Sequence, residues 1–134
     1  MLFRSLDANL VAREKEQAYV DGLDAPGSIL PIPAVIEIAR RHRDEAEGPL
    51  AVASGSVRAL VERTLRALGI TAWFDAIVAA EDTARHKPEP DVFLEAARRL
   101  GVAPATCTVY EDTDIGLEAA RRAGMASVDV RRPF

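Results

Sequence analysis

A strand, a pair of acids and a helix follow one another in VYEDTDIGLEAARRAGM (109–125). The β-forming residues at 107–110 run directly into Glu111 and Asp112. A strand of a parallel sheet is buried on both faces and reads as an apolar run. Two carboxylates about 4 Å apart repel by about 1 kcal/mol in water and by about 4 kcal/mol near a protein surface. We therefore expect a positive group beside the two acids, or an end of the strand in water.

The same alternation of strand and helix continues from Gly48 onward. Short apolar runs predict strands at 50–55, 76–82, 107–112 and 126–130. Helical spacing of apolar residues, with a glycine after an arginine-bearing last turn, predicts helices at 56–68, 91–101 and 114–124. Upstream, helices are expected at 8–23 and 34–43, with a Pro/Gly/Ser linker at 24–33. This order predicts an α/β fold in which helices cover a parallel sheet.

The overall composition is that of one ordinary globular domain. The 134 residues are 49% hydrophobic and 28% charged, which suits a core of aliphatic side chains. A net charge of −4 argues against a general nucleic-acid-binding protein. Cys107 is the single cysteine, so no internal disulfide forms, and the first residues lack the apolar region of a signal peptide. We expect a cytoplasmic protein with neither a membrane span nor a nucleic-acid partner.

Polar clusters follow three successive predicted strands, at the edge where open α/β sheets bind ligands. They are Ser54-Gly55-Ser56, Lys87 and Glu111-Asp112-Thr113. A serine hydroxyl and the N–H groups at a helix N-terminus suit a phosphate, and a lysine adds positive charge. Adjacent acids offer the hard oxygens that suit Mg²⁺. Together the clusters predict a site for phosphate and magnesium, and those ligands would relieve the repulsion between the acids.

Each cluster also has a purely structural interpretation. The two serines, taken alone, are more often helix N-caps than ligand groups. An acid or threonine of 112–114 can likewise cap the last helix, and Lys87 alone is more often a solvated loop residue. The combination at one edge of the sheet is what favours a binding site.

Three segments carry a family resemblance in their order along the chain: AVASGS (51–56), KPEPDVF (87–93) and YEDTDIGLEAARRAGM (110–125). They resemble the haloacid dehalogenase superfamily of phosphohydrolases. Within it they are most similar to the β-phosphoglucomutase-like subgroup, especially its sugar-phosphate phosphatases of the fructose-1-phosphatase type. The resemblance runs from about Ala12 to Arg131 and implies a three-layer Rossmann-like core.

The resemblance also implies roles for single residues. Ser54 and the Gly55 amide would bind the transferring phosphoryl group, and Lys87 would neutralise its oxygens. Ser54 and Lys87 are therefore the expected catalytic residues. Glu111 and Asp112 would hold Mg²⁺, with Asp112 as the more direct ligand. The expected partner is a small phosphorylated sugar, selected by a helical cap.

One part of the family's pattern is missing. Its reaction needs an aspartate nucleophile and an aspartate general acid/base in a DxDGT motif, which this sequence lacks. The segment FRSLDANLV (3–11) can be laid over that motif, with Ser5 at the nucleophile position and Asp7 at the acid position. We favour a second alignment, in which 1–28 are a remnant of the helical cap with its linker and 29–134 are a partial core.

On the second alignment the chain resembles the C-terminal part of a longer enzyme. The central strand of the sheet would be absent, leaving two unpaired edges that invite pairing with another chain. Residues 1–6 are one candidate to fill the gap, and self-association is the other.

Two classes of function remain open. The first is a Mg²⁺-dependent phosphohydrolase that acts on a small sugar phosphate through an aspartyl-phosphate, with a phosphomutase as its close relative. The second is an inactive remnant that binds phosphate, metal or a partner chain. A phosphoacceptor domain would need a different order of acids and lysine, and AVASGSVRAL (51–60) lacks the GxGxxG of dinucleotide sites. For these 134 residues alone we expect no catalysis, because the nucleophile is missing.

Overall fold

The computed structural model describes residues 2–4, 8–12, 33–45 and 48–131. Its strands are β1 (Leu2–Arg4), β2 (Ala8–Ala12), β3 (Leu50–Ala53), β4 (Ala76–Val78), β5 (Cys107–Glu111) and β6 (Ala126–Asp129). Its helices are α2 (Pro33–Asp44), α3 (Arg58–Leu68), α4 (Asp91–Leu100) and α5 (Asp114–Arg122). Three short 3₁₀ turns complete it: η1 (Thr71–Trp73), η2 (Ala80–Asp82) and η3 (Pro104–Thr106).

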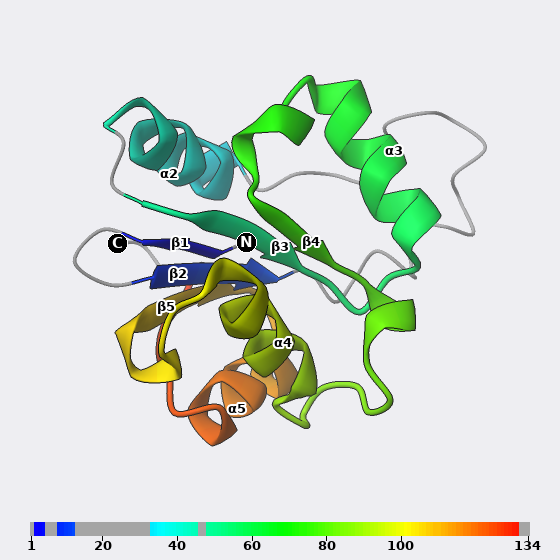
Figure 1. The fold of residues 1–134 in the computed structure, drawn as a ribbon, viewed down its shortest axis with the longest axis vertical. Helices are drawn as coiled ribbons and strands as arrows, with labels where there is room; N and C mark the ends of the chain where they lie inside the picture. The colour runs from blue at the N-terminus through cyan, green and yellow to red at the C-terminus, as the bar shows by residue number, and fades with distance from the viewer. Residues whose placement is uncertain (1, 5–7, 13–32, 46–47, 132–134) are drawn as a thin grey trace.

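The strands form one sheet in the order β4-β3-β2-β1-β5-β6, and β2 also pairs with β5. The pairs β2–β3, β3–β4, β2–β5 and β5–β6 are parallel, whereas β1 runs antiparallel to β2 and β5. Helices α2 and α3 lie on one side of this sheet, and α4 and α5 on the other (Figure 1). The predicted three-layer α/β fold is therefore confirmed.

The N-terminal segment differs from its prediction. A helix was expected at 8–23, but residues 8–12 form β2, which pairs with both β3 and β5. The edges of β3 and β5 offer N–H and C=O partners to an extended chain between them. These backbone hydrogen bonds outweigh the weak local preference of this segment for a helix. Residues 13–32 lie outside the described residues, as do Ser5 and Asp7. The division of the chain at 28 stays a prediction.

The strand predicted at 76–82 ends early, at Val78. Residues Ala80–Asp82 turn into η2 instead. The cause is local, because Asp82 Oδ2 accepts a hydrogen bond from the Ala79 N–H at 2.8 Å and so closes a turn. The acids at the end of this run therefore belong to a turn and not to the sheet.

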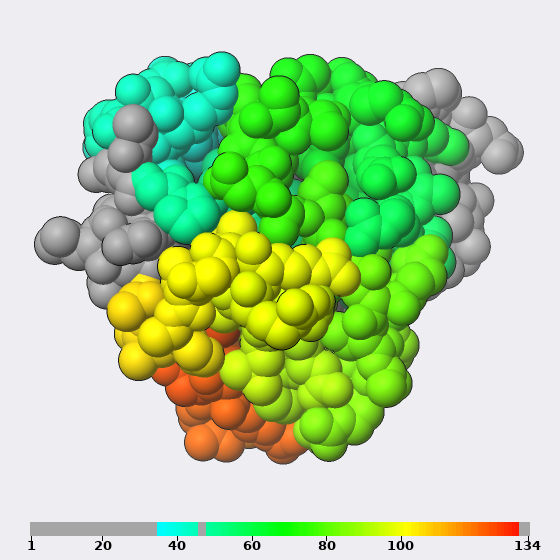
Figure 2. Space-filling view, viewed as in Figure 1, coloured from blue at the N-terminus to red at the C-terminus, as the bar shows by residue number. Residues whose placement is uncertain are grey.

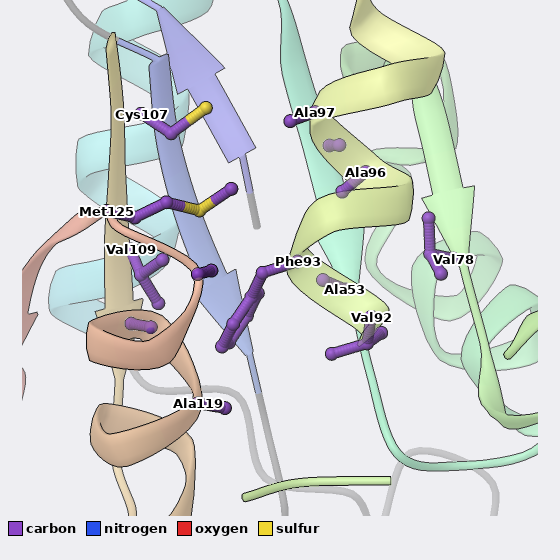
Figure 3. Close-up of a cluster of buried hydrophobic side chains, with 13 residues drawn as sticks. Ala53, Val78, Val92, Phe93, Ala96, Ala97, Cys107, Val109, Ala119 and Met125 are labelled. Atoms are coloured by element: carbon purple, nitrogen blue, oxygen red, sulfur yellow. The ribbon is translucent and has the colours of Figure 1, made fainter. Parts of the chain in front are cut away.

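The hydrophobic core has a layer on each face of the sheet. Between the sheet and helices α4 and α5 lies a cluster of small side chains around Phe93, including Ala51, Ala53, Val109 and Ala119 (Figure 3). Alternate residues of β3 point to opposite faces, so Leu50 packs in the other layer, against α2. The many alanines let α4 approach the sheet closely.

The segment from the end of α4 through η3 lies between the two helical layers on the face seen in Figure 2. It leads into the amino end of β5, so the carboxyl ends of the parallel strands form the opposite edge of the sheet. In the described part of the chain, no helix combines the length and hydropathy needed to cross a membrane.

Candidate phosphate and metal site

The three polar clusters lie at the carboxyl ends of their strands. Ser54 follows β3, and Asp112 follows β5. Between these strands lies β2, in which Val11 pairs with Val52 of β3 and Ala12 pairs with Glu111 of β5. Neighbouring strands are about 4.8 Å apart, so the ends of β3 and β5 are roughly 10 Å from each other. The two clusters therefore lie near each other at one edge of the sheet.

Lys87 is the positive group that the two acids require. Its Nζ lies 3.2 Å from Glu111 Oε2, and the two side chains are 1% and 0% exposed. The loop before α4 supplies the lysine, and the end of β5 supplies the acid. The interpretation of Lys87 as a solvated loop residue is therefore wrong, and the expectation of a positive group beside the acids is confirmed.

The second oxygen of Glu111 is also engaged. Glu111 Oε1 accepts hydrogen bonds from the N–H of Asp112 at 2.8 Å and from the N–H and hydroxyl of Thr113 at 3.1 and 3.2 Å. Gly116 packs directly against this carboxylate, since a Cβ there would lie 2.0 Å from Glu111 Cδ. Glu111 is thus held rigidly and serves as the anchor for Lys87.

Burial sets the protonation of Glu111. Removal from water raises the pKa of Glu111, the nearby ammonium of Lys87 lowers it, and the Asp112 carboxylate raises it again, which leaves the pKa at about 7. A buried ion pair gains its attraction only after both groups lose their hydration. The lysine therefore compensates for the burial of Glu111 without fully offsetting it.

Asp112 is the acid whose geometry fits a metal ion. The residue is 7% exposed, and its Oδ1 is buried without a hydrogen-bond partner among the described residues. A buried carboxylate oxygen in this state costs free energy unless something binds it. Carboxylate oxygens are the ligands that Mg²⁺ prefers. The described residues contain no group of three or more His, Cys, Asp or Glu suited to a metal, so Asp112 offers one ligand and not a complete shell.

Ser54 is buried in the turn that follows β3. Its Oγ accepts a hydrogen bond from the Ser56 N–H at 3.0 Å, and its own N–H donates to Val78 O at 2.9 Å. A hydroxyl that accepts one bond still has a proton to donate. The N-cap of α3 is Val57, without a side-chain cap, so neither serine caps this helix. Thr113 does cap α5, accepting from the Gly116 N–H at 3.0 Å.

Sequence reasoning assigned no role to Phe93, although it ends the KPEPDVF segment. Lys87 Nζ lies over the ring of Phe93, 5.1 Å from its centroid. The signal available in the sequence was the spacing, because an aromatic residue six positions after the lysine lies in the first turn of the next helix.

The haloacid dehalogenase-like hydrolase family model matches residues 4–124. The fructose-1-phosphate phosphatase YqaB of Escherichia coli K12 is 45% identical over 126 residues, which cover 94% of this chain and 64% of that protein. The β-phosphoglucomutase of Clostridium difficile is 32% identical, with a TM-score of 0.67 over 86% of this chain and 50% of that one. CbbY of Rhodobacter sphaeroides, solved in complex with phosphate, is 34% identical with a TM-score of 0.66 over 71% and 43%. The chain spans less than two thirds of each of these proteins.

Proposed function

Because the chain belongs to the haloacid dehalogenase-like hydrolase family, we propose that its site binds the phosphoryl group of a small sugar phosphate together with Mg²⁺. The observation that supports this proposal is the buried Lys87, held by Glu111, together with the buried Oδ1 of the next residue, Asp112, which has no hydrogen-bond partner among the described residues. A buried cation and an unsatisfied buried carboxylate oxygen at one sheet edge suit an anion and a metal together.

Each residue has one task in the proposed site. The Ser54 hydroxyl and the Gly55 N–H donate to phosphoryl oxygens, and Lys87 neutralises their charge. Asp112 would hold Mg²⁺, which when bound stabilises negative charge on the phosphoryl oxygens. Glu111 keeps the ammonium of Lys87 in place through its two engaged oxygens.

The complete reaction is a phosphate-ester hydrolysis through an aspartyl-phosphate, and it requires a carboxylate nucleophile. In the described part of the site, Glu111 is engaged by Lys87 and by backbone N–H groups, and Asp112 is placed to bind metal. We therefore assign phosphate and metal binding to these residues and no nucleophilic step. Binding without turnover is the second candidate function, and this shortage of a nucleophile favours it for the chain alone.

The related proteins support a sugar phosphate as the substrate class. YqaB is a fructose-1-phosphate phosphatase, and its 45% identity supports a sugar phosphate as the ligand. A phosphomutase of the same subgroup would use the same phosphate-binding residues, so these residues do not separate the two reactions.

The test measures binding and turnover side by side on the 134-residue chain. Orthophosphate binding is followed by calorimetry with Mg²⁺ and with a chelator, and hydrolysis of a chromogenic aryl phosphate is assayed in the same buffers. We expect Mg²⁺-assisted orthophosphate binding that is weakened at least tenfold in Lys87→Ala and in Asp112→Ala, without turnover. Arg66→Ala is the matched control, because it removes one exposed positive charge on α3.

Absence of orthophosphate binding in a folded chain would refute the proposed site. Mg²⁺-dependent hydrolysis that disappears in both site variants would instead refute the expectation that the chain is inactive. Hydrolysis that survives in both variants would identify a contaminating phosphatase.

A further inference from the structure

We propose that Phe93 is a positioning residue for Lys87: the face of its ring and the carboxylate of Glu111 together hold the ammonium group where it meets a phosphoryl oxygen. The phosphate contact in this inference rests on the proposed function. The contact between ring and ammonium stands on the geometry alone.

Two groups with negative charge density lie near the ammonium of Lys87, one a carboxylate and the other the face of an aromatic ring. Glu111 Oε2 is 3.2 Å from Nζ, and the centroid of the Phe93 ring is 5.1 Å from it. An aromatic ring carries negative charge density on its face, so a cation within about 6 Å of the centroid is attracted to it. The attraction is strongest where water is excluded, and the Lys87 side chain is 1% exposed.

The ring itself cannot easily move. Phe93 is 0% exposed, and it lies in the first turn of α4, where its N–H donates to Pro90 O at 3.1 Å. In Figure 3 its ring points from α4 toward the part of the cluster that contains Val109 and Ala119. The carboxylate is fixed as well, since Glu111 is held by the N–H groups of the next two residues.

A fixed ammonium matters because a lysine side chain has many rotamers. The free energy lost in ordering such a side chain subtracts from ligand binding unless the protein has ordered it beforehand. The competing view is that Phe93 only fills the core cluster. A core filler responds to ring volume, whereas a partner of the cation responds to the charge density on the ring face.

Fluorination separates these two views, because fluorine withdraws charge density from the ring at little cost in volume. We would place 3,4,5-trifluorophenylalanine at position 93, both in the wild-type chain and in Lys87→Met. The urea midpoint of unfolding is measured for all four proteins, and orthophosphate affinity is measured in the presence of Mg²⁺. The chemical shift of the Lys87 Hε protons reports the ring directly, because protons over a ring face are shifted upfield.

We expect fluorination to lower the unfolding midpoint in the lysine background and to leave it nearly unchanged in Lys87→Met. Orthophosphate affinity should fall by about twofold to tenfold on fluorination, the range of one partly desolvated cation–ring contact. In Phe93→Leu the upfield shift of the Lys87 Hε protons should disappear. Phe74→Leu is the control, because it removes a ring from the opposite face of the sheet. It should leave the orthophosphate affinity and the upfield shift of the Lys87 Hε protons unchanged.

Equal effects of fluorination in both backgrounds would show that Phe93 is only a core filler and would overturn the inference. So would an unchanged orthophosphate affinity on fluorination in a chain whose affinity depends on Lys87. If the wild-type chain binds no orthophosphate, the proposed function fails, and the unfolding midpoints with the Hε shift still decide whether the ring positions the ammonium.

Discussion

Lys87 Nζ and Glu111 Oε2 lie 3.2 Å apart in the interior of the domain, although the two residues come from different β-α units. The pair joins the loop before α4 to the carboxyl end of β5. It explains how a parallel strand can end in two adjacent acids: Lys87 compensates Glu111, while Asp112 Oδ1 is buried without a hydrogen-bond partner among the described residues.

The first prediction concerns pH. The pKa of Glu111 is raised from 4.5 to about 7, mainly by burial, so between these pH values the folded chain binds a proton that the unfolded chain releases. The stability that this proton contributes is complete below about pH 4.5 and is lost as the pH rises through about 7. Urea unfolding at a series of pH values should therefore show a falling free energy across this window.

Two variants test that assignment. Glu111→Gln should abolish the fall, because the amide does not titrate. Lys87→Met should extend the fall to higher pH and so enlarge its total, because the buried carboxylate then loses its nearby cation. A profile that is the same in all three proteins would contradict the assignment of the titration to Glu111.

The second prediction concerns the close packing of Gly116 on Glu111. Gly116→Ala would bring a Cβ to 2.0 Å from Glu111 Cδ, so the carboxylate must move away from its hydrogen-bond donors. We expect a loss of about 1–3 kcal/mol in the free energy of unfolding, typical of overpacking. In the Glu111→Ala background the same substitution should be neutral or stabilising by up to about 1 kcal/mol, because alanine is the better helix former. A loss of equal size in both backgrounds would contradict the contact.

The third prediction concerns the cap of α5. Thr113 accepts a hydrogen bond from the Gly116 N–H, and its hydroxyl also donates to Glu111 Oε1. Thr113→Val keeps the shape and loses both bonds, so it should cost about 1–2 kcal/mol in chemical denaturation. Thr113→Ser keeps the hydroxyl and should cost less than half as much. Equal losses would mean that the methyl group contributes as much as the two hydrogen bonds of the hydroxyl, and would contradict this prediction.

The fourth prediction concerns the edge of the sheet that β4 forms. Arg58 Nη2 and Arg99 Nη1 both donate to the carbonyl oxygen of Ile77, at 2.8 and 3.0 Å, and both guanidinium groups pair with Asp82. Ile77 belongs to β4, one of the two edge strands of the described sheet, and an open strand edge is a template for pairing with another chain. Arg58→Met combined with Arg99→Met should therefore increase self-association in sedimentation velocity.

The control for this edge is Arg66→Met combined with Arg98→Met, which removes the same charge from exposed helix positions. It should sediment as the wild type does. Self-association of the control to the same extent would assign the effect to net charge and not to the β4 edge.

The fifth prediction concerns Asp82 and the stability of the chain at acid pH. Burial raises the pKa of Asp82, but the Ala79 N–H and the guanidinium groups of Arg58 and Arg99 lower it more, so the net pKa lies below 3.8. Asp82 therefore contributes stability above its unfolded pKa, and this is lost as the pH falls through the folded value. Asp82→Asn should be less stable than the wild type at about pH 6, and the difference should shrink toward about pH 3. A difference that does not change with pH would contradict this role.

The sequence alone determined the regular part of the fold and the edge that carries the site. The strands at 50–53 and 107–111 and the helices that follow them are specified locally, by apolar periodicity and by Gly69 and Gly124, which follow these helices at positive φ. Because parallel strands end at a common edge, the order Ser54, Lys87, Asp112 already indicated one site.

Only the tertiary structure decided what depends on distant partners. Residues 8–12 became a strand because β3 and β5, far along the chain, offer them backbone hydrogen bonds. By residue type and position alone Glu111 and Asp112 are two neighbouring acids, and only the family resemblance favoured Asp112 as the more direct metal ligand. Their environments differ because Glu111 is fully buried and contacts Lys87, while Asp112 Oδ1 has no hydrogen-bond partner in the part of the chain that the structure describes. Local pattern specifies an element, but the partner of a buried charge is set by elements that meet only when the chain is folded.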